Sequence, residues 1–179
     1  GKTSCKDLIA EVLRVRYRVV RTRGSWNHYS GIAYTIFSVR PWHRFAVIEI
    51  GLDRPGQMVS FARAIEPDIA VWVSVARTHT MNFKSLDVTA REKSKLVEGL
   101  RPGGVGILND DNAFIADYTA PPGVRVIRYG STERSVMVPS DVSSRWPERL
   151  ALNVQPAGEE AFRLQTRFVG EHWTGSILP

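Results

Sequence analysis

Cysteine is almost absent from this sequence: Cys5 is the only one in 179 residues. A single cysteine excludes an internal disulfide, which fits a reducing compartment and predicts a cytoplasmic protein. Because free cysteine behaves as a small apolar side chain, we expect Cys5 in the core. Long apolar runs are lacking too, since the longest, 45–51 and 69–75, are strand-length. A membrane span needs roughly 20 such residues. The chain opens on GKT and not on a leader peptide. We therefore expect neither a membrane span nor a signal peptide.

Acidic residues are the minority charge. Lys and Arg total 24 against 18 Asp and Glu, which gives a net charge of +6 and a pI of about 9.8. This balance suits an anionic partner such as a nucleotide, a phosphorylated substrate or a nucleic acid. The basic residues are scattered, apart from five arginines between Arg14 and Arg23. We interpret this cluster as the solvated face of a helix end and a strand.

Apolar periodicity predicts alternating helices and strands in the first two-thirds of the chain. The expected helices are 4–15, 31–39, 58–65 and 87–100, and the expected strands are 17–22, 45–51, 69–75 and 105–109. Such alternation predicts an α/β fold with a mainly parallel sheet flanked by helices. The run 69–75 is nearly all apolar, which is typical of a strand buried on both faces.

The pattern changes after about residue 120. Short strands are expected at 124–129, 135–138, 150–154 and 161–169, with a Pro- and Ser-rich loop at 139–147. They predict a small antiparallel sheet at one flank. We therefore expect one domain over 1–179, made of an α/β core (1–112) and a β-rich flanking part (113–179).

The tripeptide Gly1-Lys2-Thr3 leads directly into the first predicted helix. It matches the last part of the phosphate-binding loop G-x-x-x-x-G-K-[ST]. Glycine lets the backbone approach phosphates, lysine reaches the β- and γ-phosphates, and the threonine hydroxyl binds Mg²⁺. Three residues alone occur by chance in roughly one chain in ten of this length. The position before a helix favours the phosphate loop.

Two polar residues follow buried strands. Glu49 lies near the end of the run FAVIEI, and His79 follows 69–75. The carboxyl ends of parallel strands face the ligand crevice of an open α/β sheet. Glu49 is equally well interpreted as a satisfied strand-end acid, and a lone histidine such as His79 is more often structural. Lys93 alone would be an ordinary surface lysine on a helix.

Five segments in this order resemble the central domain of the Mur ligases, which extend a cell-wall precursor: GKTSCKDLI, RTRGSWNHYSGIAYTI, FAVIEIGLDRPGQM, VARTHTMNFKSLDVTAREKSKLVEGL and GVGILNDDN. They span 1–112, and the final VGEHWTGSILP is similar to the family's Gly-x-His segment. The resemblance implies a phosphate-loop NTPase-like domain, truncated at both ends. It also implies an ATP-dependent ligase that joins a carboxylate to an amine through an acyl phosphate, on a UDP-muramoyl-peptide-like precursor.

The resemblance also implies the cofactors, ATP and Mg²⁺. Gly1, Lys2 and Thr3 match the phosphate loop, Asn27 matches an asparagine near the triphosphate, and His172 matches the histidine of the terminal segment. These five residues are the expected ATP-binding set.

Three further roles follow from the same resemblance. Thr3, Glu49 and His79 match the family's Mg²⁺ ligands. Lys93 matches a lysine that CO₂ carbamoylates to give an anion near the metal. Lys93 and His79 are therefore the expected catalytic residues.

The chain departs from the family pattern at the nucleotide. The family's loop reads G-N-x-N-N-x-x-G-x-P. In this chain Ser25 and His28 replace two of its asparagines, and Ala33 replaces the proline. Both asparagines of the terminal H-N-x-x-N pattern, expected near adenine, are replaced by Trp173 and Ser176. These differences predict a divergent nucleotide site and leave the acceptor substrate undefined.

A second class of function fits part of the sequence. A phosphate-loop NTPase or nucleotide-binding module that acts on a macromolecular partner would explain GKT and the basic pI. It would not explain Glu49, His79 and Lys93 together. Without an aromatic and basic RNA-binding motif, nucleic acid is not an expected partner. The expected partners are small molecules: ATP, a UDP-sugar-peptide-like carboxylate, and an amino acid or dipeptide amine. No membrane partner is expected, and the 179 residues alone are expected to be inactive.

Overall fold

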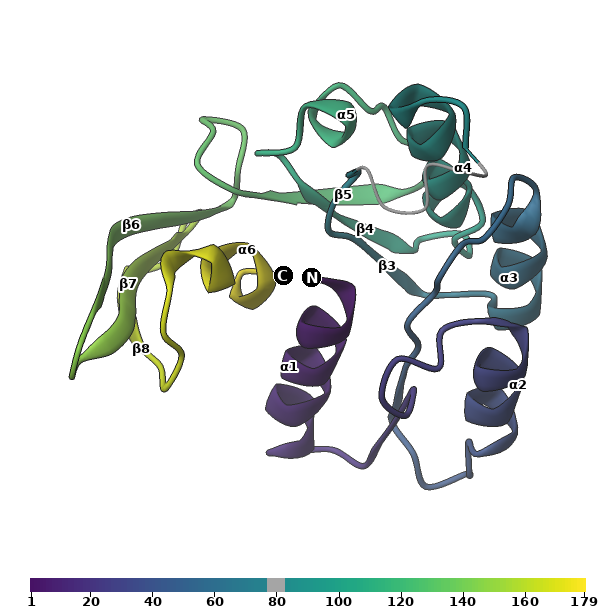
Figure 1. Cartoon of the computed structure of the whole chain (residues 1–179), viewed down its shortest axis with the longest axis horizontal. Helices are drawn as coiled ribbons and strands as arrows, with labels where there is room; N and C mark the ends of the chain where they lie inside the picture. Colours follow the sequence, from purple (N-terminus) through teal and green to yellow (C-terminus); the bar gives the residue numbers. More distant parts are fainter. Residues whose placement is uncertain (77–82) are drawn as a thin grey trace. The chain divides into compact units, whose positions relative to one another are not determined.

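The computed structural model describes residues 1–76 and 83–179, which form two compact units (Figure 1). Unit 1 comprises Gly1–Glu66 and Arg77–Gly99, and unit 2 comprises Pro67–Ala76 and Leu100–Pro179. The sequence-based division at 112/113 stays a prediction.

Unit 1 is mostly helical. Its elements are α1 (Lys2–Arg14), β1 (Val19–Arg21), α2 (Tyr29–Phe37), β2 (Phe45–Val47), α3 (Gln57–Ile65) and α4 (Leu86–Glu98). β1 and β2 pair in parallel, with Val19 opposite Phe45. Both strands are shorter than predicted, and the residues after each carboxyl end are free to turn towards one another.

Local signals set the ends of the helices. Ser85 caps α4, because its Oγ accepts a hydrogen bond from the amide of Val88 at 3.2 Å. α3 follows Gly56, whose φ of +89° favours glycine. At the end of α4, a Cβ on Gly99 would lie 2.6 Å from Cβ of Ala62 in α3. Only glycine lets these two helices approach so closely.

Unit 2 is built on one six-stranded sheet. Its strands, in sheet order, are β3 (Ile69–Trp72), β4 (Val105–Asn109), β5 (Arg125–Tyr129), β6 (Met137–Arg145), β7 (Arg149–Pro156) and β8 (Phe162–Gln165). The pairs from β3 to β6 are parallel, and β6–β7 and β7–β8 are antiparallel. Three short helices complete the unit: α5 (Ala113–Ala116), η1 (Glu171–Trp173) and α6 (Thr174–Ile177). The predicted α/β fold with an antiparallel flank is confirmed.

Two local predictions are wrong. The expected loop at 139–147 is largely β6, which pairs with β5 only at Tyr129–Met137 and otherwise has β7 as its one neighbour. Beyond Met137 one side of β6 is unpaired, as in an edge strand, so β6 tolerates Pro139 and a bulge between Ser140 and Ser143 despite a composition that is typical of a loop. Ile69, expected to be buried, is 50% exposed because it begins β3.

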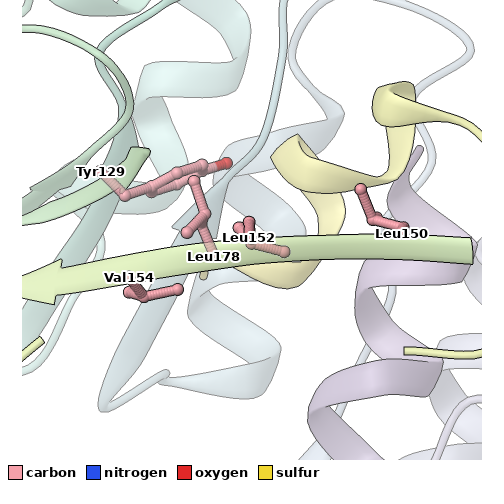
Figure 2. Close-up of a cluster of buried hydrophobic side chains, with 5 residues drawn as sticks. All are labelled: Tyr129, Leu150, Leu152, Val154 and Leu178. Carbon is pink, nitrogen blue, oxygen red and sulfur yellow. The ribbon is translucent and has the colours of Figure 1, made fainter. Parts of the chain in front are cut away.

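The core of unit 2 lies against β7 (Figure 2). Leu150, Leu152 and Val154 alternate along β7 and so share one face. Tyr129 from β5 and Leu178 after α6 pack against them. This cluster therefore ties the C-terminal segment to the sheet.

Other expectations from composition hold in the described residues. Cys5 is buried on α1, and burial raises the pKa of its thiol to about 11, so it is an inert core residue. The arginines from Arg14 to Arg23 are exposed except for the half-buried Arg21. No helix there is long and apolar enough to cross a membrane.

We expect Leu152→Ala to lower the free energy of unfolding by about 2–5 kcal/mol, because a fully buried leucine leaves a cavity. Val169→Ala, at an exposed position, is the control and should change it by less than about 1 kcal/mol. Urea denaturation of the full-length protein measures both. Equal losses in the two variants would contradict this account of the core.

Candidate phosphate and metal site

Glu49 is a buried carboxylate two residues beyond β2, only 5% exposed. Its Oε1 accepts hydrogen bonds from Oγ1 of Thr3 at 3.0 Å and from Nδ2 of Asn27 at 2.8 Å. Its backbone amide donates to Oγ1 of Thr22 at 3.0 Å. Because β1 and β2 are parallel, Thr22 and Glu49 leave the sheet at the same edge. Residues from three distant segments thus converge on one carboxylate.

Asn27 is held by a close approach of two backbones. The amide of Gly51 donates to the carbonyl of Asn27 at 2.7 Å. A Cβ built on Gly51 would lie 2.4 Å from Oδ1 of Asn27, so any larger residue would displace that side chain. Glycine at 51 is therefore a condition for the contact between Asn27 and Glu49.

The phosphate-loop residues stand at the start of α1. Gly1 is the N-cap residue, and Lys2 and Thr3 occupy the first turn, where free backbone amides and the helix dipole favour anions. Lys2 is exposed, whereas the Thr3 hydroxyl turns to Glu49. Lys2 thus remains accessible to a phosphate while Thr3 lies beside the carboxylate.

Lys93 is half-buried on α4. Burial, and to a lesser degree the nearby charge of Lys2, lower the pKa of Lys93 to about 8. A surface lysine would show no such effect. At pH 7 roughly one molecule in ten then carries the neutral amine, several hundred times the fraction for an ordinary lysine. The prediction that Lys93 reacts with CO₂ needs such a nucleophile.

The expected site also includes two histidines. His79 lies outside the described residues. His172 belongs to unit 2, where it is exposed in η1. Gly170 has a φ of +105°, and a Cβ there would lie 2.6 Å from the imidazole of His172. His172 therefore packs over the glycine of the Gly-x-His segment.

The residues that replace family asparagines after β1 are exposed. Ser25 is on the surface, and Nδ1 of His28 lies 3.0 Å from Oγ of Ser30. Neither side chain takes part in the contacts to Glu49. The replacements leave the arrangement of Thr3, Asn27 and Glu49 intact.

Sequence reasoning missed two members of the group. Thr22 accepts from the Glu49 amide, and Lys6 in α1 places Nζ 3.7 Å from Oε2 of Glu49. A signal existed for Lys6, which lies one turn after Lys2 at the i+4 position and so shares its helix face. Thr22 gave none beyond its place as the last residue of a predicted strand.

The donor set fits a magnesium ion. Oε2 of Glu49 is buried and accepts no hydrogen bond from the described residues, and its one charged neighbour among them is Nζ of Lys6 at 3.7 Å. The Thr3 hydroxyl lies beside the same carboxylate. Mg²⁺ is commonly bound by one or two carboxylates with phosphates and waters, not by an all-protein cage. Accordingly, within 1–76 and 83–179 no three His, Cys, Asp or Glu residues form a cluster.

Comparison with known proteins defines the class. The family model for the Mur ligase middle domain matches residues 1–177. The chain therefore belongs to the Mur ligase middle domain family.

Curated relatives share one name, UDP-N-acetylmuramoyl-tripeptide–D-alanyl-D-alanine ligase. The Mycobacterium leprae protein is 34% identical over 128 residues, which are 72% of this chain and 25% of that protein. The Escherichia coli protein is 31% identical over 112 residues, 63% of this chain and 25% of its own length. The chain thus spans about a quarter of these relatives.

Solved structures share the fold. A MurF crystal structure from Acinetobacter baumannii superposes with a TM-score of 0.89 at 21% identity, covering 98% of this chain and 38% of that one. MurF ligase from Thermotoga maritima, in complex with ADP, gives 0.86 at 18% identity and covers 99% and 41%.

We expect Gly51→Ala to destabilise the protein by about 1–3 kcal/mol, because the new methyl group overlaps the Asn27 amide. Asn27→Ala makes room for that methyl group, so the double variant should be less destabilised than the sum of the single changes. Urea denaturation measures all three. Gly175→Ala, with open space around its Cβ, is the control. Strict additivity would show that Gly51 and Asn27 do not touch.

We expect Lys93 to be acylated at neutral pH faster than a surface lysine, with a midpoint near pH 8. Mass spectrometry of peptides after brief acetylation across a pH series measures this. Lys2→Ala removes a neighbouring positive charge, so the midpoint should move to higher pH. A midpoint near 10 in the unmodified protein would show that Lys93 is fully solvated.

Proposed function

We propose that this chain is the ATP-binding part of an ATP-dependent ligase that forms an amide between a carboxylate and an amine. The observation that carries the proposal is the convergence of Thr3 and Asn27 on the buried carboxylate of Glu49, beside the start of α1. A phosphate loop needs a hydroxyl and an acid at this place to hold Mg²⁺. Membership of the Mur ligase middle domain family supports the same proposal.

The chain's own residues supply binding and charge. Lys2 and the first amides of α1 would hold the β- and γ-phosphates of ATP. Thr3 and Glu49, with His79, would hold Mg²⁺, which when bound neutralises phosphate charge in phosphoryl transfer. Asn27 fixes the Glu49 carboxylate by a hydrogen bond and would lie near the triphosphate. His172 would belong to the nucleotide site through its match to the family segment.

The reaction would proceed in two steps. A substrate carboxylate attacks the γ-phosphorus and releases ADP, which gives an acyl phosphate. The amine then attacks the acyl carbon and expels phosphate. Lys93, as a carbamate, would add an anion beside the cation site, and its low pKa supplies the neutral amine that carbamate formation requires.

The substrates are proposed from the relatives' names. The carboxylate would be a UDP-muramoyl-tripeptide-like precursor, and the amine D-alanyl-D-alanine or a similar dipeptide or amino acid. Such precursors are made in the cytoplasm, which is the location that we propose. Because the chain spans about a quarter of those relatives, the 179 residues alone should not complete the reaction.

Phosphate release separates this proposal from a coupled NTPase. A ligase releases phosphate from ATP only when the carboxylate and the amine are both present. An NTPase that acts on a macromolecular partner releases it without either. The full-length protein is assayed with ATP, Mg²⁺ and each substrate alone or together, and amide formation is followed by mass spectrometry. Phosphate release that does not depend on the carboxylate or on the amine would contradict the proposed ligase activity.

We expect Lys93→Ala in the full-length ligase to lose most activity, and to recover part of it with added acetate or formate. These small carboxylates would occupy the space left by the carbamate and restore an anion there. Lys95→Ala, two positions along α4, is the control and should need no rescue. Normal turnover of Lys93→Ala without any additive would refute a carbamate at this position.

A further inference from the structure

Lys6 is a buried lysine that the proposed reaction does not use. It lies in the second turn of α1 and is only 4% exposed. Burying an ammonium group costs free energy unless its donors are satisfied and its charge is balanced. An apolar residue would suit a buried helix position at no such cost. The hydrogen-bond and charge partners of Lys6 therefore indicate its structural role.

Two of these partners are backbone carbonyls just after β1. Nζ of Lys6 donates to the carbonyl of Thr22 at 3.0 Å and to that of Gly24 at 2.5 Å. Gly24 has a φ of +50°, so the chain turns sharply between these contacts. The same turn leads to Asn27. Lys6 thus fastens α1 to the segment that carries Asn27.

The charge of Lys6 is balanced by two carboxylates. Nζ lies 3.2 Å from Oδ1 of Asp7 and 3.7 Å from Oε2 of Glu49. The Glu49 and Lys6 side chains are each 3% exposed, so solvent screens their attraction little. Asp7 is more exposed and also accepts a hydrogen bond from Arg21 at 2.6 Å. The Glu49 oxygen that accepts no hydrogen bond is therefore the one that faces the ammonium.

We propose that Lys6 is a positioning residue for the cation site. It fixes Thr22, whose hydroxyl accepts from the Glu49 amide, and it fixes the turn towards Asn27, which donates to the Glu49 carboxylate. It also keeps the Glu49 carboxylate aligned through its charge. The inference rests on the metal role proposed for Glu49.

The charge of Lys6 and its hydrogen bonds have opposite effects on metal binding. As a positive charge, Lys6 repels an incoming cation, so its removal would tighten metal binding if charge alone mattered. Through its hydrogen bonds and its ion pair, Lys6 also holds the metal ligands in place, so its removal would weaken metal binding. Residues that orient metal ligands typically change affinity by roughly 10–100-fold when they are replaced. We expect positioning to dominate, with weaker binding after replacement.

Manganese binding to the full-length protein tests this without relying on catalysis. Free Mn²⁺ is followed by electron paramagnetic resonance with a non-hydrolysable ATP analogue, and the signal is compared with that of the same analogue without protein, because the triphosphate itself binds Mn²⁺. We expect Lys6→Met to weaken Mn²⁺ binding about tenfold. Lys6→Gln, which can still donate to one carbonyl, should weaken it less. Lys95→Met on the exposed face of α4 is the control and should bind as the unmodified protein does.

A double-mutant cycle shows whether Lys6 acts through the segment that it holds. If it does, adding Asn27→Ala to Lys6→Met should cost less than the product of the two single effects. Circular dichroism verifies that each variant is folded. Lys6→Gln keeps the test open if Lys6→Met does not fold.

Unchanged or tighter binding in a folded Lys6 variant would overturn the inference, as would single effects that simply multiply. Failure of the proposed function would look different. In that case the unmodified protein would bind no Mn²⁺ with the nucleotide, or Glu49→Gln would bind it equally well. Weaker binding in Glu49→Gln together with normal binding in the Lys6 variants would reject the positioning role alone.

Discussion

Glu49 is a buried carboxylate, and the cost of burying its charge constrains the segments around it. Thr3, Asn27 and the Lys6 ammonium surround its two oxygens, and Thr22 binds its backbone amide. These residues come from α1, from the turn after β1 and from the end of β2. The contacts of the proposed site therefore also hold α1 against the segments that follow β1 and β2. A change that frees one member leaves a charge or a polar group without its partner.

This arrangement separates the tasks of the first helix. Its exposed end presents Lys2 and free backbone amides, which suit an anion. Its buried side presents Thr3 and Lys6 to Glu49 and to the turn after β1. One helix can therefore serve nucleotide binding and ligand positioning at once, because Thr3 and Lys6 share its buried side while Lys2 lies at its exposed end. The departures at Ser25 and His28 lie outside these contacts.

Much of the fold was predictable because its signals are local. The alternation of helices and strands, the glycine and lysine at the start of α1 and the acid after β2 are readable within short windows. The wrong prediction at 139–147 arose where composition and pairing disagree. Pro139 and the serines near it have a composition that is typical of a loop. The hydrogen bonds to β7 nevertheless make this segment the strand β6. Pairing partners far along the chain are invisible to a local pattern.

The sequence by itself determined the family and the order of elements, and it predicted the first residues of the proposed site, since each depends on neighbours in the chain. Only the tertiary structure decided what these residues contact. Thr3 meets Glu49 across 46 residues and Lys6 meets Thr22 across 16. The lowered pKa of Lys93 likewise comes from burial and from Lys2 on another helix. Desolvation and long-range contacts exist only in the folded chain, so an apparently ordinary lysine in the sequence becomes a buried ammonium in Lys6 and a poised amine in Lys93.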